Sequence, residues 1–183
     1  EAGVDAALVR LRTDRIDVVH LHSCGVETLE RGEVIEPLSR AIEAGKVRVA
    51  AYSGDGEPLA WALRSAAFGA VQCSVGVLDQ TALCGTVREA QARGVGVLAK
   101  RPLGNAPWRF AQRPSEADVA EAWDRFRALG LDPGEPGWPA CFARFAAFAP
   151  GVSAVLVGTA RAGHLAEVVA AVAAGALEPE RAA

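Results

Sequence analysis

The sequence contains no methionine, one tyrosine and three histidines, and its four cysteines show no CxxC spacing. This cysteine pattern indicates neither a disulfide framework nor a paired-thiolate metal site, so we expect reduced thiols and a cytoplasmic protein. Apolar runs such as residues 152–157 are far shorter than the roughly 20 residues of a membrane span. We therefore expect no membrane partner and no signal peptide.

Charge of either sign is not concentrated anywhere along the chain. The 19 basic and 22 acidic residues give a net charge of −3, and the basic residues are scattered. Because nucleic acids and anionic membranes are bound through a clustered basic face, we expect neither as a partner. The 183 residues are 51% hydrophobic, which is enough for one sizeable core.

Five short apolar runs recur, and each is followed by a longer segment of helical character. Such runs are apolar almost throughout, which is typical of parallel strands covered on both faces by crossover helices. The sequence therefore predicts an α/β fold. The predicted strands are residues 16–21, 47–52, 70–74, 95–99 and 152–157. The predicted helices between and around them are residues 3–12, 27–44, 81–93 and 163–174, of which the last three end at Gly45, Gly94 and Gly175.

Residues 103–151 interrupt this alternation before the last strand. The segment holds six of the ten prolines and three of the four tryptophans. We expect a loop over residues 102–114, a helix capped by the Ser115 hydroxyl, and a second helix over residues 139–148. Such a loop and helical insertion either covers a ligand or has a purely structural role, and the sequence leaves both possibilities open.

Several short motifs have a simple alternative explanation. His20 and His22 lie two residues apart on one strand face and could hold a metal, and Cys24 beside His22 could act as a nucleophile. The chain supplies neither a further nearby histidine nor an orienting third group, so we predict no metal site. Residues 94–99 spell GxGxxA but enter a strand instead of leaving one, so they are no dinucleotide fingerprint.

Polar residues at strand ends are more informative. Residues 157–161 place Gly158, Thr159 and Arg161 where a strand ends and a helix begins, which suits a phosphate group or an ordinary capped helix. Ser53 and Gln72 also lie at strand ends, where parallel sheets bind ligands.

These features occur in an order that resembles the aldo-keto reductase family. Residues 14–22 resemble its T-D-Y-I-D-L-x-x-L-H strand, and residues 45–53 resemble G-K-V-R-x-I-G-x-S. Residues 71–72 match the family's strand with a glutamine, and residues 94–99 match G-[IV]-G-V-x-A. Residues 155–165 resemble I-x-G-[TA]-x-x-x-x-H-L. The resemblance covers nearly the whole chain.

The resemblance implies an incomplete (β/α)8 TIM barrel, with strands four to eight in one partial domain over residues 1–183. It also implies NADP(H) as cofactor and a small aldehyde or ketone as substrate. His22 would orient and polarise the carbonyl, and Asp17 would be structural. The implied cofactor-binding residues are Ser53 and Gln72 at the nicotinamide carboxamide, Gly158, Thr159 and Arg161 at the 2′-phosphate, and Lys100 and Leu103 in the same pocket.

Three departures from the family pattern matter. Gly54 stands where many members have asparagine, so a polar contact would be missing or supplied by Asp55. Lys100 stands where many have a tyrosine that stacks on nicotinamide, so that ring would need another apolar cover, for which Trp108 is a candidate. The catalytic tyrosine, lysine and aspartate lie upstream of the matched region, and Tyr52 matches no catalytic position.

We therefore expect a truncated chain, a split protein completed by another polypeptide, or a degenerate relative. The chain begins at Glu1 and lacks methionine, which agrees with truncation. Five strands cannot close a barrel of eight, so we expect exposed sheet edges that pair with a partner or with a missing amino-terminal part. The alternative to a reductase is a non-catalytic binding or assembly module derived from the same fold.

Overall fold

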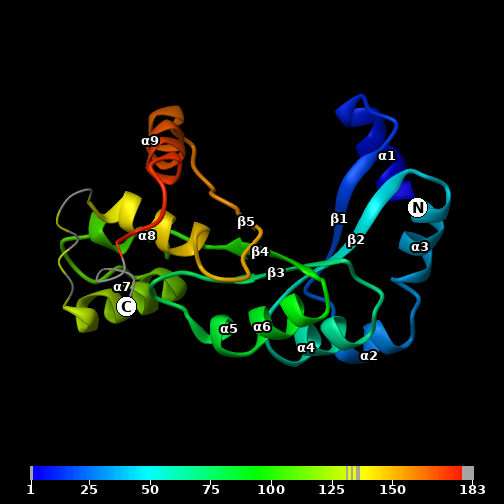
Figure 1. Cartoon of the computed structure of the whole chain (residues 1–183), viewed down its shortest axis with the longest axis horizontal. Helices are drawn as coiled ribbons and strands as arrows, with labels where there is room; N and C mark the ends of the chain where they lie inside the picture. The colour runs from blue at the N-terminus through cyan, green and yellow to red at the C-terminus, as the bar shows by residue number, and fades with distance from the viewer. Residues whose placement is uncertain (1, 131, 133, 135–136, 179–183) are drawn as a thin grey trace. The chain divides into compact units, whose positions relative to one another are not determined.

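A computed structural model describes residues 2–130, 132, 134 and 137–178. Five parallel strands form one open sheet in the order β1-β2-β3-β4-β5, with helices between them (Figure 1). The strand order follows the chain without reversal, as in a barrel, whereas a doubly wound sheet reverses at its switch point. The predicted α/β class and the five parallel strands are confirmed. The strands are β1 (Ile16–His22), β2 (Val47–Ser53), β3 (Ala70–Ser74), β4 (Gly96–Lys100) and β5 (Ala154–Val155).

The chain divides into two compact units. The first comprises Glu1–Cys73 and Arg88–Val97, and the second comprises Ser74–Val87 and Leu98–Ala183. Helix α5 (Thr81–Cys84) lies entirely in the second unit. The boundary between the units falls within helix α6 (Thr86–Ala92), which contributes residues to both. No helix within the described ranges is long and apolar enough to cross a membrane.

The first unit is built on the pairing of β1 with β2 and of β2 with β3. Its helices are α1 (Ala2–Leu11), α2 (Val26–Glu30), α3 (Glu36–Glu43) and α4 (Gly56–Arg64). Helices α3 and α4 pack against β2, and α2 packs against α4. At the amino end of the sheet Asp17 forms an ion pair with Arg48 (3.2 Å), in agreement with a structural role for Asp17.

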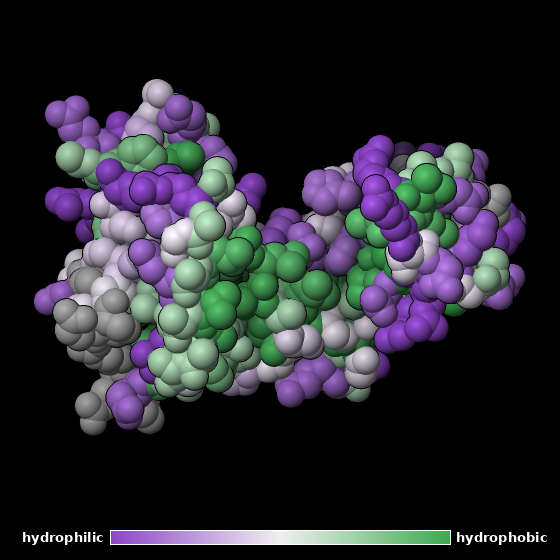
Figure 2. Space-filling view, turned by 90° about the horizontal axis from the view of Figure 1, so that it is seen from above, coloured by the Kyte–Doolittle hydropathy of each residue, from purple (hydrophilic) through white to green (hydrophobic). Residues whose placement is uncertain are grey.

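Helix α1 leaves apolar side chains on the surface of the first unit. None of its residues is buried, and Val9 and Leu11 are 80% and 63% exposed. Figure 2 shows hydrophobic side chains among hydrophilic ones in the part of the surface that α1 forms. Among the residues that the structure describes, β1 pairs with β2 alone, which leaves its other edge open. This edge and the apolar surface of α1 are the features expected of an incomplete sheet.

The second unit surrounds a cluster of four aromatic rings. The 3-10 helix η1 (Pro107–Arg109) packs against α7 (Ala117–Leu129), and α8 (Trp138–Ala147) packs against α9 (Ala162–Ala173) and β5. Trp108, Phe126, Trp138 and Phe142 meet with ring centroids 4.7–6.5 Å apart, mostly edge to face. Phe142 is fully buried. The cluster fixes η1, and with it the loop that follows β4.

Two of the predicted continuous helices are wrong, because each is interrupted. The segment predicted as 27–44 contains α2 and α3, separated at Gly32, which has a left-handed φ of +74°. The segment predicted as 81–93 contains α5 and α6, separated at Gly85, whose φ of −133° and ψ of −71° are not helical. Glycine has a low helix propensity, so a turn conformation is easily adopted in place of a continuous helix at both positions. The predicted stops at Gly45, Gly94 and Gly175 are confirmed by left-handed φ values of 71°, 69° and 91°.

Two further boundaries differ from the prediction. Ser115 does not cap α7: its hydroxyl donates to the Glu116 carboxylate at 3.4 Å, and Glu116 occupies the cap position without a side-chain capping bond. Strand β5 is limited to two residues instead of 152–157. Val152 donates its N–H to Ala149 in a turn, and β5 is the last strand of the sheet, paired with β4 alone.

Candidate functional site

Three predicted site residues lie side by side in the first unit. His22 at the end of β1 is the register partner of Ser53 at the end of β2, and Ser53 is the register partner of Gln72 in β3. Backbone bonds continue this pairing, because Ser23 N–H donates to Ser53 O (2.9 Å) and Gly54 N–H donates to Gln72 O (3.2 Å). Register partners in parallel strands share a sheet face, so an imidazole, a hydroxyl and an amide form one polar row.

Ser53 is the most unusual member of this row. It is 1% exposed, and its buried Oγ has no hydrogen-bond partner among the residues that the structure describes. A buried hydroxyl left unpaired costs about 1–3 kcal/mol, so such an atom usually has a ligand or water to bond. His22 beside it is exposed. The row therefore combines an orphaned hydroxyl with an accessible imidazole.

His20 lies two residues before His22 on the same strand face. Its Nε2 is buried and lacks a partner in the described part of the chain. Burial, and secondly the nearby His22, lower the pKa of His20 below its ordinary value of 6.5. His20 is therefore a neutral imidazole at neutral pH, beneath the polar row.

The lowered pKa of His20 predicts an acid-sensitive fold. The unfolded chain takes up a proton at His20 near pH 6.5, whereas the folded chain does so only at lower pH. The stability that this residue contributes is thus complete above pH 6.5 and decreases as the pH falls toward the folded pKa. We expect the urea midpoint to fall less between pH 7 and pH 5 in His20→Gln than in the wild type. The exposed His164→Gln is the control, and equal pH dependence in wild type and His20→Gln would contradict the assignment.

Tyr52 points to the opposite face of β2 from Ser53, as the alternation of the strand predicts. Its hydroxyl donates to the carbonyl of Cys24 at 2.8 Å, and its ring lies against Phe68 with centroids 5.9 Å apart. The side chain is 1% exposed. Burial first, then the nearby Cys24 and Asp55, raise the pKa of Tyr52 above its ordinary value of 10. The tyrosine therefore stays protonated and links β2 to the loop that follows β1.

The position of Tyr52 accounts for Gly54. A Cβ at residue 54 would lie 2.7 Å from Cε1 and 2.8 Å from the hydroxyl oxygen of Tyr52. Such distances are shorter than van der Waals contact, so no side chain fits there while the tyrosine keeps its place. The asparagine that many aldo-keto reductases have at this position is excluded by Tyr52.

The second unit contains a cavity of about 630 Å³, formed by the segments that follow β4 and β5 and by the start of α9. Of the cofactor residues expected in this unit, Leu103, Gly158, Thr159 and Arg161 line it. Lys100 and Trp108 are not among the lining residues, and Trp108 belongs to the aromatic cluster. The cofactor role of all these residues remains a prediction.

Local bonding shapes the loop between β5 and α9. The Thr159 hydroxyl accepts a hydrogen bond from Arg161 N–H at 3.2 Å, and Arg161 caps the helix by backbone alone. The first intrahelical bond runs from Leu165 N–H to Arg161 O. The N–H groups of the first helical turn, which includes the lining residue His164, thus have no intrahelical acceptor. Together with the helix dipole they favour an anion.

Sequence reasoning missed three cationic or titratable residues of this cavity: Arg101, Arg109 and His164. Arg101 could have been found, because it directly follows the predicted fourth strand. Arg109 could not, because it reaches the cavity only through the left-handed turn at Asn105 and Ala106, with φ of 63° and 51°. In the part of the chain that the structure describes, no aspartate or glutamate lines the cavity.

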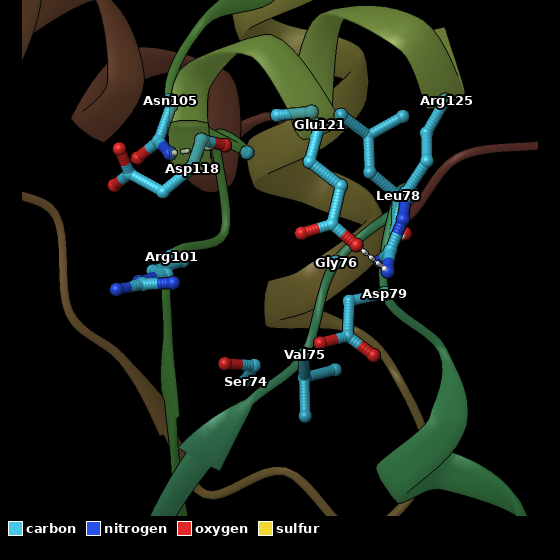
Figure 3. Close-up of a pocket in the computed structure, with 12 residues that line it drawn as sticks. Ser74, Val75, Gly76, Leu78, Asp79, Arg101, Asn105, Asp118, Glu121 and Arg125 are labelled. Carbon is cyan, nitrogen blue, oxygen red and sulfur yellow. Dashed lines mark hydrogen bonds and ion pairs between the residues drawn. The ribbon is translucent and has the colours of Figure 1, made fainter. Parts of the chain in front are cut away.

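A smaller cavity of about 160 Å³ lies where the loops after β3 and β4 meet α7, and Figure 3 shows its side chains. Its charges are largely satisfied within the fold. Arg125 bonds to Glu121 (2.6 Å) and to Leu78 O (3.1 Å), and Asp79 accepts from Thr81 N–H (3.3 Å). Within the described ranges no group of three or more metal-ligating side chains occurs. This cavity is a structural junction.

Comparison with known proteins was made for the whole chain. The Aldo/keto reductase family model matches residues 1–183. Among solved structures, an aldo-keto reductase from Bacillus halodurans superimposes with a TM-score of 0.83 in both its holo and apo forms, at 21% and 20% identity. These matches cover 99% of this chain and 63–64% of the solved chain. An aldo-keto reductase from Pseudomonas aeruginosa gives a TM-score of 0.68 at 26% identity, covering 94% of this chain and 56% of the other.

Among curated protein sequences, none matches this chain. The structural matches confirm the predicted TIM-barrel type of fold, and the chain spans less than two thirds of the length of the relatives named above. The family match over the full chain confirms the resemblance seen in the motifs. The chain belongs to the aldo-keto reductase family.

Proposed function

We propose that this chain is the cofactor-binding portion of an NADP(H)-dependent aldo-keto reductase that reduces aldehyde or ketone carbonyls. One observation carries the proposal: Leu103 and the three residues of a separate motif, Gly158, Thr159 and Arg161, line a single cavity. Its volume of about 630 Å³ is within the range of ligand and cofactor sites. The family match makes oxidoreductase chemistry the natural use of such a cavity.

The residues present fit the cofactor. Arg101, Arg109 and Arg161 line this cavity, and among the described residues no aspartate or glutamate lines it, which favours phosphate groups. In the first unit, the orphaned Ser53 hydroxyl and the Gln72 amide offer the donors and acceptors that a carboxamide needs. NADPH, when bound, supplies a hydride to the carbonyl carbon.

His22 is the residue of this chain that would orient the substrate. It is exposed at the carboxyl end of β1, and an imidazole N–H can donate a hydrogen bond to a carbonyl oxygen. That bond would hold the carbonyl and polarise it. His20, which is neutral and half-buried beneath it, adds no positive charge at neutral pH.

The proton for the developing alkoxide must come from another group. Tyr52 cannot supply it, because its hydroxyl is buried, bonded to Cys24 O and directed to the opposite strand face. We propose that a polypeptide segment carrying the family's tyrosine, lysine and aspartate completes the reductase. The open edge of β1 and the exposed apolar residues of α1 are the surface of the first unit that it would cover.

The single tyrosine of the sequence is buried and its hydroxyl donates to Cys24 O, so it is not available as a catalytic acid. This favours a second candidate, a binding or assembly module without catalysis. The two candidates differ in turnover. We expect the 183-residue chain to bind NADPH, observed as a change in cofactor fluorescence, and to oxidise NADPH with an activated aldehyde only once the completing segment is added. Binding with no turnover in either case would support a nucleotide-binding module. No NADPH binding would contradict the reductase and would leave an assembly module.

Arg161→Ala is expected to weaken NADPH binding by about 10- to 100-fold. The reason is the loss of charged hydrogen bonds to the 2′-phosphate, each of which is worth about 1.5–3 kcal/mol. NADH lacks this phosphate, so its affinity should change little. Fluorescence titration measures both constants, and Arg161→Lys should retain part of the preference. An unchanged NADPH affinity in Arg161→Ala would show that the 2′-phosphate lies elsewhere.

A further inference from the structure

We propose that His20 is a positioning residue for Ser53: its imidazole Nε2 accepts the proton of the Ser53 hydroxyl and thereby fixes which hydrogen bond Ser53 offers to a ligand. This inference rests on the proposed function, in which Ser53 bonds to the carboxamide of the nicotinamide. It extends that function to a histidine that the cofactor motifs do not include, and it predicts selectivity for a carboxamide over a carboxylate.

His20 and Ser53 share an unusual property. In the part of the chain that the structure describes, the buried side-chain nitrogen and oxygen atoms without a hydrogen-bond partner are His20 Nε2 and Ser53 Oγ. Each of these atoms costs free energy for as long as it stays unpaired. Both residues belong to the first unit. A bond between them would satisfy both atoms at once.

The sheet brings the two side chains within reach of each other. Strands β1 and β2 are neighbours, and His22 on β1 is the register partner of Ser53 on β2 (Figure 1). His20 lies two residues before His22 and therefore on the same face. His20 and Ser53 are thus diagonal neighbours, about 5 Å apart across the strands and about 7 Å along them. An imidazole that leans along its strand spans most of this separation, so rotation of the side chains brings Nε2 and Oγ together without movement of the backbone.

The residues beside His20 leave room for this rotation. Its register partner on β2 is Ala51, and Ala51 pairs in turn with Ala70 on β3. Both alanines are buried, so the row beneath Ser53 is small and apolar next to His20. In such surroundings a polar atom has few other partners, and a hydrogen bond is stronger than in water. The Ser53 hydroxyl is therefore well suited as the partner of His20 Nε2.

The direction of the bond follows from the chemistry of the two groups. Burial, and secondly the nearby His22, lower the pKa of His20, so its ring is neutral at neutral pH and one ring nitrogen has a free lone pair. An imidazole nitrogen is a much stronger base than a hydroxyl oxygen, so the single proton of Ser53 is donated to it. With that proton engaged, Ser53 Oγ presents lone pairs alone to a ligand.

This arrangement makes Ser53 an acceptor. Its oxygen accepts a hydrogen bond from the N–H of a carboxamide, whereas a carboxylate at the same place has no proton to donate and is repelled by the lone pairs. Without His20 the hydroxyl turns freely and donates to either group. His20 thus determines ligand selectivity through Ser53, without touching the ligand itself.

The test compares two ligands that differ in this one group. NADP+ carries the carboxamide, and nicotinic acid adenine dinucleotide phosphate carries a carboxylate. The full 183-residue chain is titrated with each by calorimetry. We expect the wild type to prefer NADP+ by about tenfold or more, and His20→Leu to lose most of that preference because it binds the carboxylate more tightly. His20→Gln, whose amide oxygen also accepts from Ser53, should keep the preference.

Two further variants separate positioning from a merely structural role. In a Ser53→Ala background, His20→Leu should have no further effect on the preference, because His20 acts through the hydroxyl. Val19→Ala is the matched control: Val19 is half-buried on the same strand but lies on the opposite face, so the preference should stay unchanged. Circular dichroism and the melting temperature establish that each variant is folded.

Nitrogen NMR of isotope-labelled histidine tests the bond in the chain alone. The His20 signal, identified by its loss in His20→Gln, should show a neutral ring with the proton on Nδ1 and none on Nε2. The Nε2 resonance should shift in Ser53→Ala, because the donor is removed. A proton on Nε2, or a resonance that Ser53→Ala leaves unchanged, would overturn the inference even if His20→Leu does not fold.

The outcomes separate this inference from the proposed function. If NADP+ binds with Arg161-dependent affinity but His20→Leu keeps the wild-type preference, the inference is wrong and the proposed function stands. If His20→Leu weakens both ligands equally, His20 is structural and the inference is again wrong. If the wild type binds neither ligand, the proposed function is overturned and the predicted selectivity with it.

Discussion

Phe142→Ala is expected to lower the free energy of unfolding of the second unit by about 3–5 kcal/mol. Phe142 is 0% exposed, and its ring meets those of Trp108, Trp138 and Phe126 at centroid distances of 4.9, 5.9 and 6.4 Å. Truncation removes the centre of the cluster and leaves a cavity among rigid rings. Rings of this shape cannot collapse into the space, so most of the lost packing is not recovered.

Urea unfolding monitored by tryptophan fluorescence measures this effect, because Trp108, Trp123 and Trp138 all belong to the second unit. Phe148→Ala is the matched control: it follows the same helix and is 45% exposed, so its loss should be near 1 kcal/mol or less. Similar losses in the two variants would mean that the aromatic cluster does not form the core of this unit.

The Phe142 variant also tests how the anion cavity is held in place. Trp108 packs on Phe142 and immediately precedes Arg109, and a Cβ at Gly104 would lie 3.5 Å from the Phe142 ring. A loosened cluster should therefore reduce NADPH affinity even under conditions where the variant remains folded. Unchanged NADPH affinity would show that the loop keeps its geometry without the cluster.

Gly54→Ala is expected to destabilise the first unit by about 1–3 kcal/mol, the usual range for overpacking. The added Cβ would lie 2.7 Å from Tyr52 Cε1, and Tyr52 is fully buried. To relieve this contact the ring must move, which breaks its hydrogen bond to Cys24 O (2.8 Å). Because Gly54 N–H also donates to Gln72 O, the polar row of Ser53 and Gln72 should be disturbed as well.

A double-mutant cycle isolates the contact between these two residues. Gly54→Ala should cost much less in a Tyr52→Leu background, since the atoms that it meets belong to the Tyr52 ring. Gly163→Ala is the control, because a Cβ there meets nothing within 4 Å and improves helix propensity. Additive effects of Gly54→Ala and Tyr52→Leu on the urea midpoint would contradict the steric explanation.

Much of the fold could be predicted from the residues because it depends on local pattern. Apolar runs with β-branched residues mark the strands, and glycines mark helix ends, so β3 and the stop at Gly45 agree with the prediction. Helix interruptions were missed at Gly32 and Gly85, since helical periodicity continues across both positions while the backbone does not. Ser115 has the right type for a cap, but its hydroxyl is bonded to Glu116.

The candidate site was partly predictable for a similar reason. His22, Ser53 and Gln72 lie at the ends of successive parallel strands, so their adjacency follows from the strand order alone. The position of Arg109 in the cavity depends on a left-handed turn and on an aromatic cluster, both formed within residues 104–142. No local sequence pattern predicts either feature. Likewise the reason for Gly54 is the position of the Tyr52 ring, which the alternation of the strand does not reveal.

By itself, the sequence determined the parallel α/β architecture, the family and the row of polar residues at the strand ends, because each follows from residue type and spacing along the chain. Only the tertiary structure decided that the hydroxyl of the single tyrosine is buried and donates a hydrogen bond to Cys24 O. It also decided that Ser53 Oγ has no hydrogen-bond partner within the described ranges. Finally, it placed Arg109 and Arg161 in the lining of the same cavity. The physical reason is range: strand and helix patterns arise from neighbours in the chain, whereas hydrogen-bond satisfaction, steric exclusion and charge convergence depend on atoms that only folding brings together.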